Sequence, residues 1–313
     1  MEDKRGFYII IGGPTAIGKS SIGIELARQL NGEIVNADSR QIYKDFDIGT
    51  GKPSSEELKI VPHHLFSFLD GNQRFSAFEY MEKASEIIKE AAMRKRVPIV
   101  VGGTGLYIHS LLYGLFPEGE RDEKLREKII AEGEDIGWEK VYEKLMEIDR
   151  EYAEKISPND KIRIIRALEV YYKTGKTLTE NFKLTESPLK EFYSIKIFLN
   201  ERRDRLYEKI NRRVELMFEN GLIEEVKALI KKGYNEESPA FQSIGYKYAL
   251  MIIEGKIEKK EALRLMQRDT RHYAKRQIVW FKKEKGFQHF NPSDFKKIMN
   301  FVQKEIRWKE LSL

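Results

Sequence analysis

The sequence contains no cysteine and no long apolar run. Without cysteine among its 313 residues, the chain has no disulfide, no thiol nucleophile and no cysteine-ligated zinc site. The longest apolar runs lie near residues 7–11 and 99–101, far short of the roughly 20 residues that a membrane-spanning helix needs. Residues 1–5 lack the apolar core of a secretion signal. We therefore expect a cytoplasmic protein with no membrane contact.

Histidine is scarce, and acidic residues do not balance the basic ones. The five histidines, of which His63 and His64 are adjacent, show no metal-binding spacing, and we expect this pair to serve packing rather than catalysis. The net charge of +6 favours a polyanionic partner, although ordinary variation in surface charge gives the same figure. The length predicts about two domains, and a hydrophobic content of 41% is enough for a sizeable core.

A glycine-rich segment between an apolar run and a helical pattern carries the strongest signal. Residues 13–20 fit G-x-x-x-x-G-K-[ST], the P-loop, in a strand–loop–helix context. The segment consists of Gly13, Pro14, Thr15, Ala16, Ile17, Gly18, Lys19 and Ser20. Its glycines allow backbone N–H groups to face a phosphate, Lys19 adds a positive charge, and the Ser20 hydroxyl can reach Mg²⁺. The loop predicts a diphosphate or triphosphate ligand without identifying the reaction.

Two further predicted strands, residues 33–37 and 97–101, end in polar or glycine-rich turns that contain Asp38 and Thr104. Because ligands bind at the carboxyl ends of parallel strands, Asp38 is expected to face the P-loop. A helix cap at Asp38 is the alternative. The strand before Thr104 does not end in the aspartate typical of NTP-hydrolysing motors. This absence disfavours ATP hydrolysis and favours a small substrate that carries phosphate.

Strand-like patterns vanish after residue 116 and return at residues 192–199. We therefore predict an α/β fold: a P-loop NTPase-like parallel sheet flanked by helices, with a helical insertion domain. The catalytic core, with basic C-terminal helices, comprises residues 1–116 and 188–313, and the insertion comprises residues 117–187.

A long helix is predicted over residues 258–285, and its basic residues recur at helical spacing. They are Arg264, Arg268, Arg271 and Lys275. A solvated face is the ordinary explanation of such a stripe. Acids are scarce along it, and aromatic residues interleave with it, so contact with nucleic acid is an equal alternative.

Taken together, these segments resemble the tRNA dimethylallyltransferases. The similarity runs in family order from about residue 7 to residue 282, over residues 13–20, 36–43, 47–53, 62–65, 101–107, 166–179, 243–246 and 271–280. The resemblance implies transfer of a dimethylallyl group from dimethylallyl diphosphate to N6 of the adenine 3′ to the tRNA anticodon, with release of pyrophosphate. The P-loop would hold the leaving diphosphate with Mg²⁺, which Ser20 would contact.

The resemblance also implies roles for particular residues. Catalytic roles fall to Asp38, Thr104 and Arg213, with Arg213 near the diphosphate and Asp38 as general base toward N6. The implied tRNA contacts are Asp38, Ser39, Arg40, Gln41, Thr104, Arg126, Ile162, Arg163, Ile164, Ile165, Arg166, Gln242, Ser243, Ile244, Gly245, Tyr246 and Lys247, to which the basic stripe adds Arg268, Arg271 and Lys275. The chain departs from common family usage at Ser20, where threonine is frequent, and at Arg40, where methionine is frequent.

Two other functions fit part of these observations. A P-loop kinase of small molecules would use Asp38 to orient a hydroxyl and the insertion as a lid. A prenyltransferase acting on free adenine nucleotides would not need a large insertion for the anticodon stem-loop. We expect a monomer with tRNA and dimethylallyl diphosphate as partners.

Overall fold

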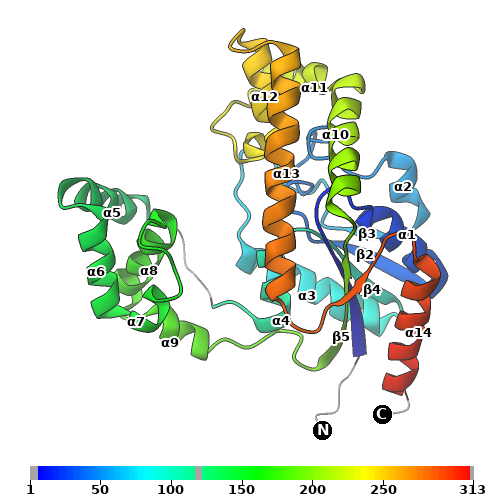
Figure 1. Cartoon of the computed structure of the whole chain (residues 1–313). Helices are drawn as coiled ribbons and strands as arrows, with labels where there is room; N and C mark the ends of the chain where they lie inside the picture. The colour runs from blue at the N-terminus through cyan, green and yellow to red at the C-terminus, as the bar shows by residue number, and fades with distance from the viewer. Residues whose placement is uncertain (1–5, 117–121, 311–313) are drawn as a thin grey trace. The chain divides into compact units, whose positions relative to one another are not determined.

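The computed structural model describes residues 6–116 and 122–310, with side chains through residue 307. In this part of the chain, six parallel strands form one sheet in the order β3-β2-β4-β1-β5-β6 (Figure 1). The strands are β1 (Gly6–Gly12), β2 (Gly32–Asn36), β3 (His63–His64), β4 (Val97–Gly102), β5 (Phe192–Leu199) and β6 (Gln288–Phe290). The predicted α/β class with a parallel sheet is confirmed.

The central strand β1 is buried on both faces, which explains its continuous apolar sequence. Ile9 and Ile11 pack on one side with α1 (Lys19–Leu30) and α14 (Phe295–Glu310). Tyr8 and Ile10 pack on the other side with α3 (Ala77–Met93) and α4 (Gly105–Tyr113). The sheet therefore lies between two helical layers, and the carboxyl ends of its strands present loops at one edge.

A second core joins further helices to the loop that follows β2. These helices are α10 (Arg203–Glu219), α11 (Leu222–Lys231), α12 (Ile244–Ile253) and α13 (Lys259–Lys283), with the short turn η1 (Pro239–Gln242). The short helix α2 (Ser55–Ile60) contributes no residue to this core. Phe46 is fully buried there, with its ring against those of Tyr234, Phe241 and Tyr246. These ring contacts anchor the loop that follows β2 at Phe46.

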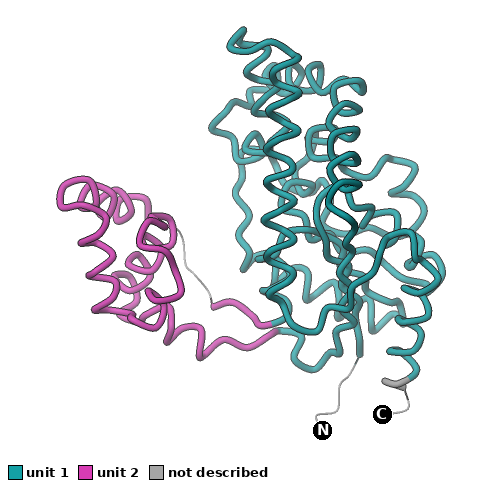
Figure 2. The backbone as a smooth tube through the Cα atoms, viewed as in Figure 1, with its two compact units in different colours: residues 1–112, 188–313 teal, residues 113–187 magenta. Residues whose placement is uncertain are grey.

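The chain divides into two compact units, residues 1–112 with 188–313, and residues 113–187 (Figure 2). The second unit contains α5 (Glu123–Asp135), α6 (Trp138–Ile148), α7 (Arg150–Ala153), α8 (Lys161–Thr174) and α9 (Leu178–Lys183). It has an apolar core of its own, built around Ile129, Leu145 and Leu168. The compact unit starts at Tyr113, whereas the sequence pattern placed the start of the insertion at residue 117.

The adjacent histidines form the edge strand β3, beside β2. His64 Nε2 lies 2.8 Å from the carboxylate of the buried Glu33, which also accepts a hydrogen bond from Arg94. The pair therefore has a structural setting at the sheet edge. Across the described residues, no helix is long and apolar enough to cross a membrane.

Candidate active site

The P-loop leads from the end of β1 into the first turn of α1. Gly18 is the helix N-cap and adopts a φ of 101°, which favours glycine. Because Gly18 has no side chain to cap the helix, the first N–H groups of α1 keep their capacity to bind an anion. Lys19 Nζ donates to the carbonyl of Pro14 at 2.8 Å, so the ammonium is held beside the loop.

Asp38 and Thr104 lie on neighbouring loops at the carboxyl ends of β2 and β4. The Asp38 backbone N–H donates to Asn36 Oδ1 at 2.9 Å, and Asp38 Oδ1 accepts the Arg40 N–H at 2.9 Å. Thr104 Oγ1 accepts the Ser39 N–H at 3.0 Å. These bonds fix the Asp38 backbone, and one carboxylate oxygen is not used in the turn.

Charged and phenolic groups surround Asp38. Burial lowers the pKa of Lys19 to about 8, with the Asp38 charge opposing this shift and Arg213 adding to it. Burial also lowers the pKa of Arg213, again opposed by Asp38. The pKa of Tyr273 is raised by burial and by the Asp38 carboxylate. The P-loop lysine, Asp38 and Arg213 thus act on one another electrostatically, as expected if all three face one ligand.

Arg213 reaches this site from α10 across the loop after β2. Its Nη2 lies 3.4 Å and 3.5 Å from the carbonyl oxygens of Thr50 and Gly51. A Cβ on Gly51 would lie 1.9 Å from Nη2, so only glycine admits the guanidinium here. Gln41 donates to the same Gly51 carbonyl at 2.9 Å. The predicted RNA contact Gln41 therefore has a bond within the loop, and Arg40 has one to the carbonyl of Pro239.

Glu225 on α11 holds the same loop and was missed by sequence reasoning. Its carboxylate accepts the backbone N–H groups of Asp47, Ile48 and Gly49 at 3.2, 2.8 and 3.1 Å. It also accepts the hydroxyl of Tyr246 at 2.7 Å. A glutamate among several on a predicted amphipathic helix gives no signal of this role, because its partners come from a distant loop.

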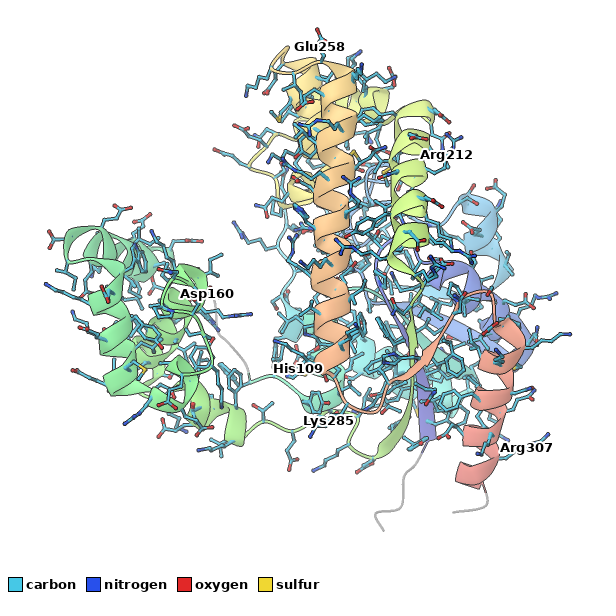
Figure 3. All side chains as sticks on the ribbon, viewed as in Figure 1. His109, Asp160, Arg212, Glu258, Lys285 and Arg307 are labelled. Atoms are coloured by element: carbon cyan, nitrogen blue, oxygen red, sulfur yellow. The ribbon has the colours of Figure 1, made fainter. Side chains whose placement is uncertain are left out.

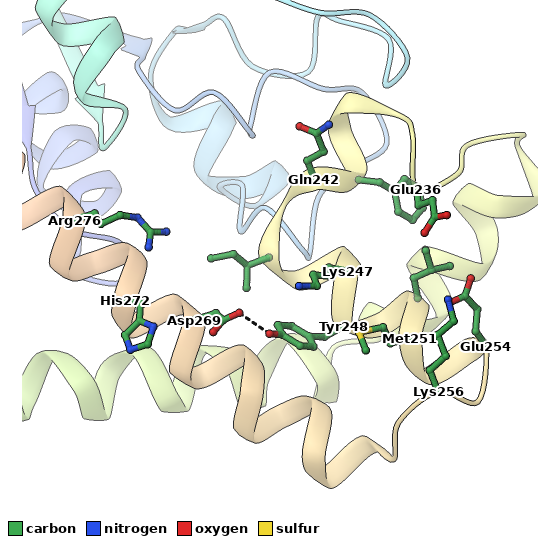
Figure 4. A pocket seen from close by; sticks show the side chains of 13 residues that line it. Glu236, Gln242, Lys247, Tyr248, Met251, Glu254, Lys256, Asp269, His272 and Arg276 are labelled. Carbon is green, nitrogen blue, oxygen red and sulfur yellow. Dashed lines mark hydrogen bonds and ion pairs between the residues drawn. The ribbon is translucent and has the colours of Figure 1, made fainter. Parts of the chain in front are cut away.

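The predicted contact segment 242–247 spans the end of η1 and the start of α12. Ser243, Gly245 and Tyr246 are buried, whereas Gln242 and Lys247 are exposed. The exposed pair lines a pocket of about 690 Å³ with Tyr248, His272 and Arg276 (Figure 4). Tyr248 donates its hydroxyl to Asp269 at 2.5 Å within this pocket. The pocket thus combines aromatic side chains with both cationic and acidic ones, the acids being Glu236, Glu254 and Asp269.

The basic stripe on α13 is partly neutralised. Arg264 pairs with Glu261, and Arg268 Nε lies 2.9 Å from Asp269. Arg271 donates to Asn211 at 2.7 Å and lies against the Tyr207 ring. Lys275 is exposed and makes no ion pair within the described ranges. The four predicted cations therefore differ in their availability to a polyanion.

The predicted contacts in the second unit also differ from one another. Arg126 and Arg166 both bind the fully buried Glu169, at 2.9 and 3.0 Å. Arg163 forms an ion pair with Asp160 at 3.1 Å. Asp160 is labelled in Figure 3. Ile162 is 74% exposed, whereas Ile164 and Ile165 belong to the core of this unit. Of the predicted contacts in this unit, Ile162 and Arg163 are therefore the exposed ones.

Comparison with known proteins gives consistent results. The IPP transferase family model matches residues 41–284, and an isopentenyl transferase model matches residues 6–67. A tRNA dimethylallyltransferase of Halothermothrix orenii is 44% identical over 96% of this chain and 92% of its own length. One of Caldanaerobacter subterraneus subsp. tengcongensis is 46% identical over 92% of each chain.

Solved structures agree with these relatives. The full-length tRNA isopentenylpyrophosphate transferase of Bacillus halodurans aligns with a TM-score of 0.71 at 35% identity, over 97% of this chain and 98% of that one. A eukaryotic dimethylallyltransferase acting on tRNA aligns with a TM-score of 0.80 at 30% identity, over 96% of this chain and 77% of that one.

Proposed function

We propose how the site works from one premise: the chain belongs to the IPP transferase family, and its activity is the prenylation of adenine in tRNA. The donor in the proposal is dimethylallyl diphosphate and the acceptor is N6 of the adenine 3′ to the anticodon. The observation that carries the residue assignment is the electrostatic grouping of Asp38 with Lys19 and Arg213 at the carboxyl edge of the sheet.

The donor's diphosphate binds the P-loop in this proposal. The N–H groups at the start of α1 and the Lys19 ammonium face the phosphate oxygens, and Arg213 adds a second cation. Mg²⁺ fits this donor set, because the Ser20 hydroxyl is a hard oxygen ligand that complements the phosphate oxygens. No group of three or more His, Cys, Asp or Glu able to hold a metal occurs among the described residues, so protein ligands would be few. When bound, Mg²⁺ would neutralise charge on the diphosphate.

The acceptor amine needs a base, because its lone pair is delocalised into the adenine ring. In the proposed step, N6 attacks the first carbon of the dimethylallyl group, the carbon–oxygen bond to the diphosphate breaks, and pyrophosphate leaves with the bond's electrons. Asp38 accepts the N6 proton as the new bond forms. Thr104 fixes the backbone at Ser39 and so supports the position of Asp38.

The RNA binds exposed cationic side chains and the Gln242 amide in this proposal. Gln242 and Lys247 at the pocket, Lys275 on α13 and Arg163 in the second unit are exposed. The adenine leaves its stack to reach the base, as is general for enzymes that modify a nucleobase. The proposed working unit is a monomer. We place this tRNA-modifying activity in the cytoplasm.

A labelled-donor experiment tests the acceptor. The enzyme is given labelled dimethylallyl diphosphate with tRNA, AMP or ATP in separate reactions. Label is expected in tRNA alone, at the adenine 3′ to the anticodon. Faster labelling of AMP or ATP than of tRNA would overturn the proposed acceptor, and labelling of another tRNA position would overturn the proposed target.

A further inference from the structure

The carboxyl-terminal half of α13 packs against glycines of the two loops that flank the reaction centre. A Cβ on Gly12, at the end of β1, would lie 2.1 Å from the Phe281 ring. A Cβ on Gly105, beside Thr104, would lie 2.4 Å from the Trp280 ring. A larger residue at either position would therefore force the facing ring of α13 to move. Gly12 and Gly105 therefore allow α13 to pack closely against the two loops.

Gln277 forms the polar part of this contact. Its side chain is 5% exposed, and both ends of its amide are used. The amide oxygen accepts the Thr15 N–H of the P-loop at 2.8 Å. The amide nitrogen donates to the carbonyl of Gly103 at 2.9 Å. One side chain thus spans the diphosphate loop and the residue before Thr104.

Gly103 is matched to this arrangement. A Cβ there would lie 2.2 Å from Gln277 Nε2, so a larger residue would expel the amide. The helix also carries Lys275 and Arg276, which are exposed and lie next to Gln277 in the sequence. The same turn of α13 therefore presents cations to solvent and an amide to the two loops.

We propose that Gln277 is a positioning residue that sets the diphosphate loop and the Thr104 loop at their working separation, from the helix that faces the RNA. The assignment rests on the proposed function, since it takes the P-loop as the donor site and Thr104 as the support of the base. Gln277 touches neither substrate. Its effect is on turnover, because small errors in the relative placement of donor and base reduce rate steeply.

The competing explanation is that Gln277 contributes packing alone. Two substitutions distinguish this packing role from the positioning role. Gln277→Met keeps most of the volume and removes both hydrogen bonds. Gln277→Glu keeps the shape and makes the bonds depend on protonation. A neutral glutamic acid can accept from the Thr15 N–H and donate its O–H to the Gly103 carbonyl, as the amide does. An ionised glutamate instead places a negative oxygen against that carbonyl.

The chain offers a matched control ten residues earlier on the same helix. Gln267 is half-buried, and its side-chain amide lies at the long distances of 3.4 Å from the Asn211 carbonyl and 3.5 Å from Glu215. Gln267→Met and Gln267→Glu therefore repeat the same chemical changes away from the loops. Thermal melts of all four full-length variants identify those that remain folded before activity is compared.

Single-turnover prenyl transfer to tRNA is measured with saturating donor from pH 6 to pH 8.5. Gln277→Met is expected to be slower than wild type by about 10- to 100-fold at every pH. Gln277→Glu should match that loss at pH 8.5 and recover to within a few-fold of wild type at pH 6, because burial raises the pKa of a carboxyl group. The ratio to wild type cancels the pH effects that the two enzymes share. The affinity for tRNA should stay within about twofold of wild type.

A Gln277→Met enzyme within threefold of wild type, or a Gln277→Glu to wild-type ratio that does not change with pH, would overturn the positioning role. A Gln267 pair with the same losses would overturn it also. Wild-type enzyme that labels no tRNA under these conditions would instead contradict the proposed function, so the two failures are distinguishable.

Discussion

Asp38 is the residue on which the proposed chemistry depends most directly. Its backbone is fixed by Asn36 and Arg40, and one carboxylate oxygen is not used in the turn. Asp38→Asn preserves the shape and the hydrogen-bond acceptor, yet cannot take a proton. We expect the single-turnover rate to fall by about 10²-fold or more, with tRNA affinity near normal.

The pH chosen for this test matters, because Asp38 helps to keep Lys19 protonated. Burial lowers the pKa of Lys19 to about 8, and Asp38 opposes that shift. Removing the Asp38 charge therefore lowers the Lys19 pKa further. At pH 6.5 the lysine stays protonated and diphosphate affinity should be nearly unchanged. A rate within a few-fold of wild type would show that Asp38 is not the base, and a collapse of diphosphate affinity at this pH would favour a metal-ligand role.

For some residues around Asp38, the position in the site could be predicted from the sequence, and for others it could not. The adjacency of Asp38 to the P-loop follows from strand order, since parallel strands end at one edge. The partners of Glu225 and Gln277 lie in distant loops, and their identities depend on tertiary packing. The catalytic and RNA-binding roles carried over from the family remain predictions.

At the scale of elements, buried strands were predictable and exposed ones were not. Strands β1 and β4 have continuous apolar interiors, because helices cover both faces of the sheet. Strands β2 and β5 are mostly apolar but include polar residues, among them Glu33 in β2 and Lys196 in β5. Strand β6 is short, and Gln288 and His289 are exposed, so no apolar run marks it. The two-residue β3 is defined by its backbone pairing with β2, and no sequence pattern marks so short a strand.

Helix α11 supports the loop after β2 through Glu225. Three backbone N–H groups and the Tyr246 hydroxyl donate to the Glu225 carboxylate, and Glu225→Gln removes its negative charge. A hydrogen bond to a charged group contributes about 1.5–3 kcal/mol to folding stability. We expect faster hydrogen exchange at residues 47–51 and weaker pyrophosphate binding, since this loop contacts Arg213. The exposed neighbour Glu224→Gln is the control. Equal exchange in both variants would contradict the clamp.

Helix α8 supports the second unit through Glu169. Burial opposes its ionisation, but the Asp122 N–H and the guanidinium groups of Arg166 and Arg126 outweigh this, so the pKa lies below its ordinary value of 4.5. A depressed folded-state pKa contributes stability above pH 4.5 that is lost as pH falls through the folded value. We expect the helices of this unit to lose exchange protection on acidification below about pH 4.5.

Glu169→Gln tests the same network at neutral pH. Removing one partner of a buried ion pair costs about 3–5 kcal/mol, and here Arg126 and Arg166 both lose the buried carboxylate charge that they share. The exposed pair Arg150–Glu154 provides the control, and Glu154→Gln should change exchange little. Unchanged protection of residues 123–183 in Glu169→Gln would refute a stabilising role for this network.

At the scale of the whole molecule, the net charge of +6 becomes meaningful only through its distribution. Several basic side chains form ion pairs with acidic side chains of the protein, as Arg268 does with Asp269 and Arg166 does with Glu169. Others, including Lys247 at the pocket and Lys275 on α13, are exposed. A polyanion binds where cations are available, so these two should contribute more to tRNA affinity than Arg268.

Salt dependence measures this distribution directly. Each phosphate that is no longer neutralised should reduce the slope of log affinity against log salt by about 0.7 to 0.9, so Lys247→Ala with Lys275→Ala should reduce it by about 1.4 to 1.8. Lys296→Ala with Arg307→Ala removes the same charge from exposed positions on α14 (Figure 3). If both double variants change the slope equally, net charge rather than a defined surface determines tRNA binding. Lys247 and Lys275 are exposed, and within the described residues neither bonds to the P-loop, so pyrophosphate affinity should be unchanged in the first pair, which separates RNA docking from donor binding.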